Sequence, residues 1–157
     1  MIRGEVEVRD SIEPDQLSSL VELFAHEWWS QTRTMEDVTR MLLASDVVVT
    51  LAHRSTRRLM GFARVLTDGV YLALILDVIV EPAARGLGLS SLLMETVLNH
   101  PKVSLARSVE LVCQPELMPF YQRFGFSDQV GRSRLMRRTT DAALTGVSAV
   151  SNLTDPK

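Results

Sequence analysis

The chain of 157 residues contains a single cysteine, Cys113, and therefore cannot hold an internal disulfide framework. Because disulfides mark oxidising compartments, this absence leads us to expect a reducing cytoplasm. No apolar run approaches the ~20 residues of a membrane span, and the first residues lack the apolar core of a signal peptide. We therefore expect no association with a membrane.

An excess of charge of one sign is also missing. The 17 Lys and Arg residues oppose 19 Asp and Glu residues, for a net charge of −2. Such a balance provides no broad basic surface, so we expect no nucleic-acid partner. The three histidines are scattered along the chain and predict no metal site. The Gly-x-Ser-x-Gly elbow of serine hydrolases is absent as well, so neither a bound metal nor that type of serine nucleophile is expected.

The sequence does contain a glycine turn between an apolar run and an amphipathic run. The most apolar stretch, 70–80, precedes the turn Arg85-Gly86-Leu87-Gly88-Leu89-Ser90. The following run places Leu89, Leu92, Leu93 and Val97 on one helical face. Glycine lets a tight turn approach a ligand, and the first amides of a helix lack intrahelical acceptors. This order of strand, glycine turn and helix predicts a site for a phosphate group.

Two common phosphate-binding patterns fit this turn poorly. A dinucleotide-binding turn requires a third glycine, and Ser91 occupies that position. A nucleoside-triphosphate loop requires Gly-Lys-Ser/Thr, which the chain lacks.

A third pattern fits better when the turn is considered with the later sequence Phe120-Tyr121-Gln122-Arg123-Phe124-Gly125-Phe126. The segment 77–126 resembles the GNAT superfamily of N-acetyltransferases, which carries Gln/Arg-x-x-Gly-x-Gly/Ala and then Tyr-x-x-x-Gly-Phe. Arg85, Gly88 and Ser90 fall on the first motif, where Ser90 departs from the family pattern. Two motifs in the correct order, a helix and a strand apart, make the resemblance specific.

Apolar periodicity predicts an α+β domain with a mixed sheet of about six strands and flanking helices. The expected strands are 5–9, 46–53, 59–67, 70–80, 109–113 and 130–136, and the expected helices are 14–28, 34–42, 88–99 and 115–124. We expect a single domain over 1–138 and a loosely held polar tail over 139–157. The resemblance implies the same order, with a cofactor cleft between two splayed parallel strands.

The resemblance further implies acetyl-CoA as co-substrate. The pantetheine arm would pair with the backbone of Val78, Ile79 and Val80. The pyrophosphate would lie on a turn formed by Arg85, Gly86, Leu87, Gly88, Leu89, Ser90 and Ser91. Gln114 stands where many relatives carry a cofactor-contacting asparagine.

Tyr121 and Asp77 are the candidate catalytic residues. The resemblance places Tyr121 opposite the cofactor sulfur, and a phenol with a pKa near 10 can protonate a leaving thiolate; a packed aromatic ring is the alternative. Asp77 is the only charge in its apolar run, so it should be hydrogen-bonded, face a cavity or mark a bulge. It could order the acceptor amine, or it could be structural. Arg64 could pair with Asp77 or Glu81 or face substrate, and Cys113 is a competing nucleophile, or a small buried residue.

The end of the first helix, which the resemblance places beside the acceptor, supplies candidate pocket residues. Trp28 continues the apolar stripe of Val21 and Phe24, so we expect Trp28 in the core and Trp29 in the pocket. Glu27 and His26 are alternative proton acceptors or solvated residues.

These observations predict transfer of an acetyl or other short acyl group from acyl-CoA to a primary amine of a small molecule or protein. The attack would be direct, in a ternary complex. A catalytically silent acyl-CoA-binding or interaction module is the alternative, with a dinucleotide-binding domain as a third. A homodimer is compatible with either function.

Overall fold

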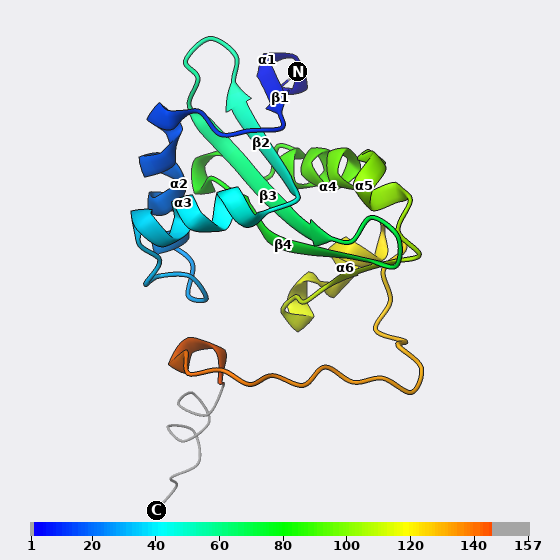
Figure 1. Cartoon of the computed structure of the whole chain (residues 1–157). Helices are drawn as coiled ribbons and strands as arrows, with labels where there is room; N and C mark the ends of the chain where they lie inside the picture. Colours follow the sequence, from blue (N-terminus) through cyan, green and yellow to red (C-terminus); the bar gives the residue numbers. More distant parts are fainter. Residues whose placement is uncertain (1, 146–157) are drawn as a thin grey trace, which may run out of the picture.

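A five-stranded sheet in the order β1-β2-β3-β4-β5 forms the centre of the protein, as the computed structural model of residues 2–145 shows (Figure 1). The strands are β1 (Val6–Arg9), β2 (Val47–His53), β3 (Leu59–Thr67), β4 (Leu72–Val80) and β5 (Ser108–Leu111). The α-helices are α1 (Ile2–Glu5), α2 (Leu17–Ala25), α3 (Met35–Ala44), α4 (Leu89–Asn99), α5 (Pro101–Ser104) and α6 (Met118–Gln122). Short 3-10 turns are η1 (Pro14–Gln16), η2 (Pro82–Ala84), η3 (Pro115–Leu117) and η4 (Ala142–Leu144).

The sheet is antiparallel from β1 to β4, and only β5 runs parallel to its neighbour β4. The chain passes from β4 to β5 through α4, which is the crossover helix that a parallel pair requires. The turn between β3 and β4 is closed by Asp68, whose carboxylate accepts hydrogen bonds from three consecutive backbone amides, Val70 to Leu72. These bonds lower the pKa of Asp68.

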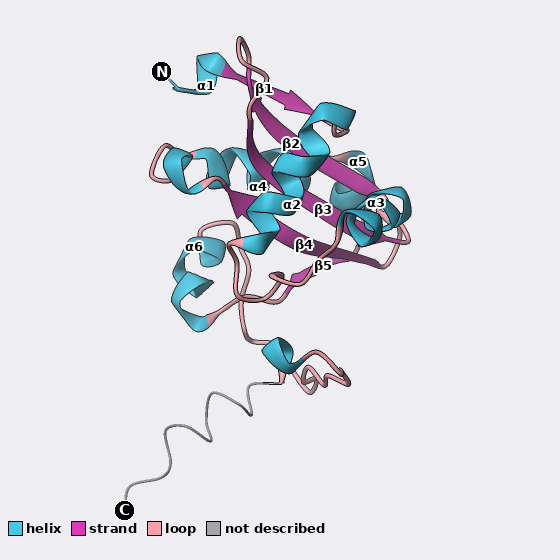
Figure 2. Cartoon of the chain, turned by 90° about the vertical axis from the view of Figure 1, so that its left-hand side faces the viewer, coloured by secondary structure: helices cyan, strands magenta, loops and turns pink. Residues whose placement is uncertain are grey.

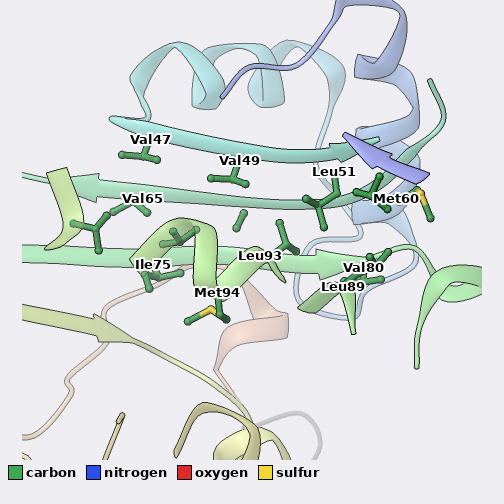
Figure 3. Packing of buried hydrophobic residues seen from close by; sticks show 14 of the residues in the cluster. Val47, Val49, Leu51, Met60, Val65, Ile75, Val80, Leu89, Leu93 and Met94 are labelled. Atoms are coloured by element: carbon green, nitrogen blue, oxygen red, sulfur yellow. The ribbon is translucent and has the colours of Figure 1, made fainter. Parts of the chain in front are cut away.

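Helices cover both faces of the sheet (Figure 2). On one face, α4 packs on the central strands, where Val49, Leu51, Leu93 and Met94 meet (Figure 3). On the other face, α2 and α3 bury a second cluster that includes Phe24 and Val38. The predicted cap of the second helix is confirmed, since the Thr34 side chain accepts a hydrogen bond from the Asp37 amide.

The fold class is as predicted, but the number of strands and several boundaries differ. The sheet has five strands where about six were expected, because residues 130–136 form no strand. The expected strand 70–80 begins only at Leu72, since the Asp68 carboxylate holds residues 70–72 in the preceding turn. The first helix ends at Ala25, so Trp28 lies beyond its last turn.

The chain leaves the sheet and helices after Phe126, and residues 127–145 form what we call the C-terminal arm (Figures 1 and 2). Of the tail expected over 139–157, the first seven residues belong to this arm and include η4. Residues 146–157 lie outside the described part of the chain.

Candidate active site

The candidate site begins where β4 and β5 stop pairing. Their ladder runs from Leu72 opposite Ser108 to Ile75 opposite Leu111, and there β5 ends. β4 continues to Val80 with only β3 beside it. Because β5 ends part-way along β4, peptide groups in the second half of β4 are left available to a ligand.

The pairing with β3 decides which of these peptide groups face outward. The Glu81 amide donates to the Met60 carbonyl at 2.9 Å, so Glu81 faces β3. Because peptide groups in an antiparallel strand alternate between the two sides, Ile79 also faces β3, opposite Phe62. Val78 and Val80 present their peptide groups to the side that β5 has left.

The glycine turn lies at the end of this strand and leads directly into α4. Gly86 and Gly88 have φ values of 77° and 79°, a backbone conformation that residues other than glycine rarely adopt. Apart from each glycine's own atoms and those of its neighbours along the chain, nothing lies within 4 Å of a Cβ built on Gly86 or Gly88. Gly88 is the N-cap of α4 and provides no side chain to cap the first amides, while Leu89 anchors the helix in the core. The turn thus exposes unpaired amides at a helix N-terminus, and this arrangement fits an anionic group.

The Arg85 side chain has two partners. Its Nε donates to the Val80 carbonyl at 3.1 Å, and its Nη2 donates to the Glu27 carboxylate at 2.7 Å. This ion pair ties the end of β4 to the loop after α2. The sequence analysis assigned Glu27 to the acceptor site and Arg85 to the cofactor site. The ion pair places the two residues side by side.

Arg123 is a residue that the sequence reasoning did not select. Its Nη2 donates to the Ser91 hydroxyl at 3.2 Å, in the first turn of α4. Its guanidinium also stacks over Phe120 and Phe124, at 5.5 and 5.8 Å from the ring centroids. A positive charge beside uncapped helix amides adds to the affinity for an anion. Its place two residues after Tyr121 in the second motif was the available signal.

Tyr121 belongs to the core cluster that also contains Leu89 and Leu93, and it is only 8% exposed. Its ring makes edge contacts with Phe120 and Phe126, at 5.0 and 6.1 Å between centroids. Burial, together with the nearby Cys113, raises the pKa of Tyr121 to about 12. The phenol is therefore protonated at neutral pH and can donate a proton.

Cys113 and Gln114 lie between β5 and η3. Burial, followed by the charge of Glu116, raises the pKa of the half-buried Cys113 thiol. A raised pKa makes the thiolate scarcer and the thiol a poorer nucleophile. Gln114 is the N-cap of η3, where its carbonyl accepts the Leu117 amide at 3.0 Å.

Asp77 combines two of the three features expected of it, a bulge and hydrogen bonds. Its φ of 55° coincides with the register shift between β3 and β4. Its carboxylate, 6% exposed, accepts a bidentate pair from Arg33 at 2.8 and 3.0 Å and a bond from Arg64 at 2.6 Å. Asp77 is thus the centre of an Arg33–Asp77–Arg64 triad, and Arg64 takes the first of its predicted alternatives.

Arg33 connects this triad to the aromatic side chains at the end of α2. Its guanidinium lies 4.4 Å from the Phe24 ring centroid and 5.4 Å from that of Trp29. Trp29 packs edge-on against Phe24, whereas Trp28 is 51% exposed. The expectation that Trp28 continues the core stripe was therefore wrong, because the helix ends before it. Arg33 was not selected from the sequence, in which it is one of many scattered arginines.

His26, the alternative proton acceptor, uses Nδ1 to donate to the Glu22 carbonyl at 2.8 Å and is exposed. Two open surface hollows of about 390 and 460 Å³ lie beside β1 and β2, at the sheet edge opposite the turn. Within residues 2–145, no three His, Cys, Asp or Glu side chains are grouped as for a metal ion. In the same residues, every helix is too short or too polar to cross a membrane.

Comparisons with known proteins fit this geometry. Residues 9–138 match the family model described as an acetyltransferase (GNAT) domain. The chain is 33% identical over 123 residues to serotonin N-acetyltransferase 2 from Oryza sativa subsp. japonica, covering 76% of this chain and 60% of the relative. The chain spans about half the length of the curated relatives it matches.

Solved structures share the fold. A GNAT-family protein from Xanthomonas campestris superposes with a TM-score of 0.73 at 27% identity, covering 86% of this chain and 93% of that one. A structure with acetyl-CoA from Clostridium acetobutylicum has a TM-score of 0.60 at 15% identity, covering 83% and 96%, and so shares the fold alone. With the family model matched over most of its length, the chain belongs to the GNAT acetyltransferase family.

Proposed function

We propose that the protein transfers an acetyl or other short acyl group from acyl-CoA to a primary amine, as an N-acetyltransferase. The observation that carries the proposal is the combination of an uncapped α4 N-terminus with the unpaired edge of β4. The amides after Gly88 and the Arg123 guanidinium would hold the pyrophosphate. The Val78 peptide group and the Val80 amide would hold the pantetheine arm, while the Val80 carbonyl stays with Arg85.

Acetyl-CoA supplies the thioester, and the chain supplies orientation and one proton. The neutral amine forms a C–N bond to the thioester carbonyl carbon as the C–S bond breaks. Tyr121 donates its hydroxyl proton to the departing sulfur and is reprotonated from solvent. The amine loses its surplus proton to water, since guanidinium groups already occupy the carboxylates of Asp77 and Glu27.

We assign Asp77 and Glu27 positioning roles on this basis. The Arg33–Asp77–Arg64 triad fixes Trp29 and the loop after α2, which together would form one wall of the acceptor site. One relative is named a serotonin N-acetyltransferase, so small arylalkylamines are the first acceptors to test, followed by lysine peptides. The cytoplasm remains our proposal for the site of action.

Calorimetry with acetyl-CoA tests the cofactor site. Gly88→Val should abolish binding, because the branched side chain enters the space through which the phosphates approach. Gly69→Val is the matched control, since Gly69 has a φ of 74° and the same open surroundings but lies in the β3–β4 turn. Both substitutions place a branched residue at a positive φ, so backbone strain is present in both variants and the control accounts for it. Arg123→Gln should weaken binding without abolishing it.

Two outcomes would contradict the proposal. Equal acetyl-CoA binding by Gly88→Val and Gly69→Val would place the cofactor elsewhere. Normal binding by the parent chain, with no release of thiol for any amine in the panel, would favour the silent acyl-CoA-binding module instead.

A further inference from the structure

The outer edge of β2 is covered over only part of its length. β1 pairs with β2 as far as Arg9, opposite Thr50, and there β1 ends. β2 itself begins at Val47, so its first residues have β3 on one side and, within the described residues, no strand on the other. Figure 3 shows β1 beside the Leu51 end of β2 and not beside the Val47 end. The first residues of β2 therefore form an open strand edge.

Val48 presents its peptide groups to this open side. The Arg54 amide donates to the Glu5 carbonyl at 2.7 Å, so Arg54 faces β1. Peptide groups alternate between the two sides of an antiparallel strand, so Thr50 and Val48 face the same side as Arg54. No backbone group in the described part of the chain bonds to Val48 on that side. The Val48 amide and carbonyl are therefore free to pair with another extended segment.

A hollow lies on each face of the sheet beside Val48. The hollow of about 390 Å³ is on the α4 face, where Thr96 and His100 form part of its wall. The hollow of about 460 Å³ is on the opposite face, where Leu17 of α2 and Leu42 of α3 line it. Val48 lines both hollows. Because side chains of a strand point alternately to the two faces of its sheet, a segment paired with Val48 would place successive side chains in the two hollows.

The larger hollow is suited to a side chain with an apolar stem and a positive end. Val48 packs on this face of the sheet, and a residue directly opposite Val48 would point to the same face. Among the described residues that line the hollow there are three carboxylates and no Lys, Arg or His. Glu13 is already paired with arginines. Asp10 is exposed and forms no ion pair within the described residues, and Asp46 uses one oxygen to accept the Thr67 amide at 2.8 Å. The stem of a basic side chain would lie on the leucines of α3 while its charge meets the free carboxylate oxygens.

We propose that the open edge of β2 is a docking site for an extended segment of a partner protein that places an arginine or lysine opposite Val48. The segment would exchange two backbone hydrogen bonds with Val48 as an antiparallel pair. Its basic side chain would enter the larger hollow, and a neighbouring side chain would enter the smaller hollow beside Val49. In strand order β2 is separated by β3 from β4, which carries the cofactor edge, so the inference does not depend on the transferase activity.

A labelled peptide tests the site in solution. The probe is Ser-Thr-Val-Arg-Val-Thr-Ser with fluorescein on its N-terminus, and arginine is used so that the acceptor site is offered no primary amine. The β-branched residues favour an extended backbone. Fluorescence anisotropy should show saturable binding, and the Val48 amide should shift in a proton–nitrogen correlation spectrum of the mixture. A probe with glutamate in place of the arginine should not bind.

Methylation of single amides in the probe separates strand pairing from attraction by charge alone. A methyl group on the amide of the central arginine removes the donor to the Val48 carbonyl, and binding should be lost. A methyl group on the amide of the following valine is the matched control. That amide points away from β2 in the proposed pairing, so the affinity should stay close to that of the unmethylated probe.

Two variants test the same contacts on the protein. Val48→Pro removes an amide that faces outward, a position at which an edge strand tolerates proline, and it should abolish binding. The double variant Asp10→Asn/Asp46→Asn should raise the Kd of the probe by roughly threefold to tenfold, as expected for two exposed charge pairs. Glu110→Gln/Asp128→Asn is the control, because it removes two exposed charges from β5 and the C-terminal arm and should leave the Kd unchanged.

Four results would overturn the proposal. These are no saturable binding by the unmethylated probe, equal affinity for the two methylated probes, and binding without a shift at Val48. The fourth is an affinity for the probe that falls as the protein concentration rises, which would assign the edge to a second copy of the chain. If Val48→Pro does not fold, the two methylated probes decide, since they need no change in the protein.

Discussion

Replacing Asp77 by Asn tests whether the triad at the β4 bulge is structural or catalytic. Asn tolerates the left-handed backbone that Asp77 adopts at φ 55°, so the substitution removes the charge and little else. The side chains of Arg33 and Arg64, 27% and 14% exposed, then lose the carboxylate that neutralises them.

The size of the effect follows from the burial of the three groups. Removing one partner of a buried ion pair costs 3–5 kcal/mol, and the partial hydration of Arg33 favours the lower end, about 3 kcal/mol. That is a large share of the roughly 5–15 kcal/mol that stabilises a domain. At about 2–4 °C per kcal/mol for a chain of this size, the melting temperature should fall by roughly 6–12 °C.

Three measurements decide between the roles. Thermal unfolding gives the loss of stability, with Glu95→Gln as a control that breaks the exposed Arg3–Glu95 pair and should cost under about 1 kcal/mol. A double-mutant cycle with Arg33→Gln should show that the double variant loses less than the sum of the single losses. Single-turnover transfer at saturating amine should stay close to the parental rate per folded molecule, while KM for the amine rises.

An unchanged melting temperature with lost turnover would refute this reasoning. It would mean that the carboxylate is not committed to the two guanidiniums during the reaction. Asp77 would then be a proton acceptor after all.

The remaining predictions concern Tyr121. Tyr121→Phe should lower single-turnover transfer about 10²-fold, the lower end for general acid catalysis, because a thiolate can also leave unassisted; transfer at the parental rate would remove the phenol from the mechanism. In a phenolate absorbance titration, the parent should show a late step near pH 12 that Tyr121→Phe lacks. Folding raises the pKa of Tyr121 from 10 to about 12. The contribution of the protonated phenol to the free energy of unfolding is therefore complete below pH 10 and is lost as the pH rises toward 12. Between pH 10 and 12, the free energy of unfolding of the parent should therefore fall by about 3 kcal/mol more than that of Tyr121→Phe. Equal losses would show that the phenol is not buried as described.

Sequence reasoning was most successful where the signal is local. The turn at Gly86 and Gly88, the cap at Thr34 and the bulge at Asp77 each follow from the preferences of one or two residues. Periodicity likewise located every strand from β1 to β5. Each of these features depends on the backbone conformation that one or two residue types prefer, so residue type alone was enough to predict it.

Side-chain partnerships across the fold were harder to predict. The bond between Arg33 and Asp77 spans 44 positions, and that between Arg123 and Ser91 spans 32. Nothing in the sequence selects Arg33 from the other arginines, and Arg123 is marked only by its place in the second motif, since the pairing is set by how loops meet in space. Trp28 was placed wrongly for a similar reason, because the end of α2 lacks a strong stop signal and helix boundaries are poorly determined by periodicity.

Because the β4–β5 ladder ends early, the amides in the two halves of β4 should exchange their hydrogens with solvent by different routes. Amides of β4 up to Ile75 lie between two neighbouring strands, whereas the Val78 and Val80 amides face the side without a strand. In deuterium, the first group should exchange through larger openings of the sheet, and the second through local fluctuations. A ligand bound along this edge would slow the exchange at Val78 and Val80 while leaving Ile79 as it was. The alternation of this single strand therefore provides a residue-level footprint of the cleft that can be read without any catalytic turnover.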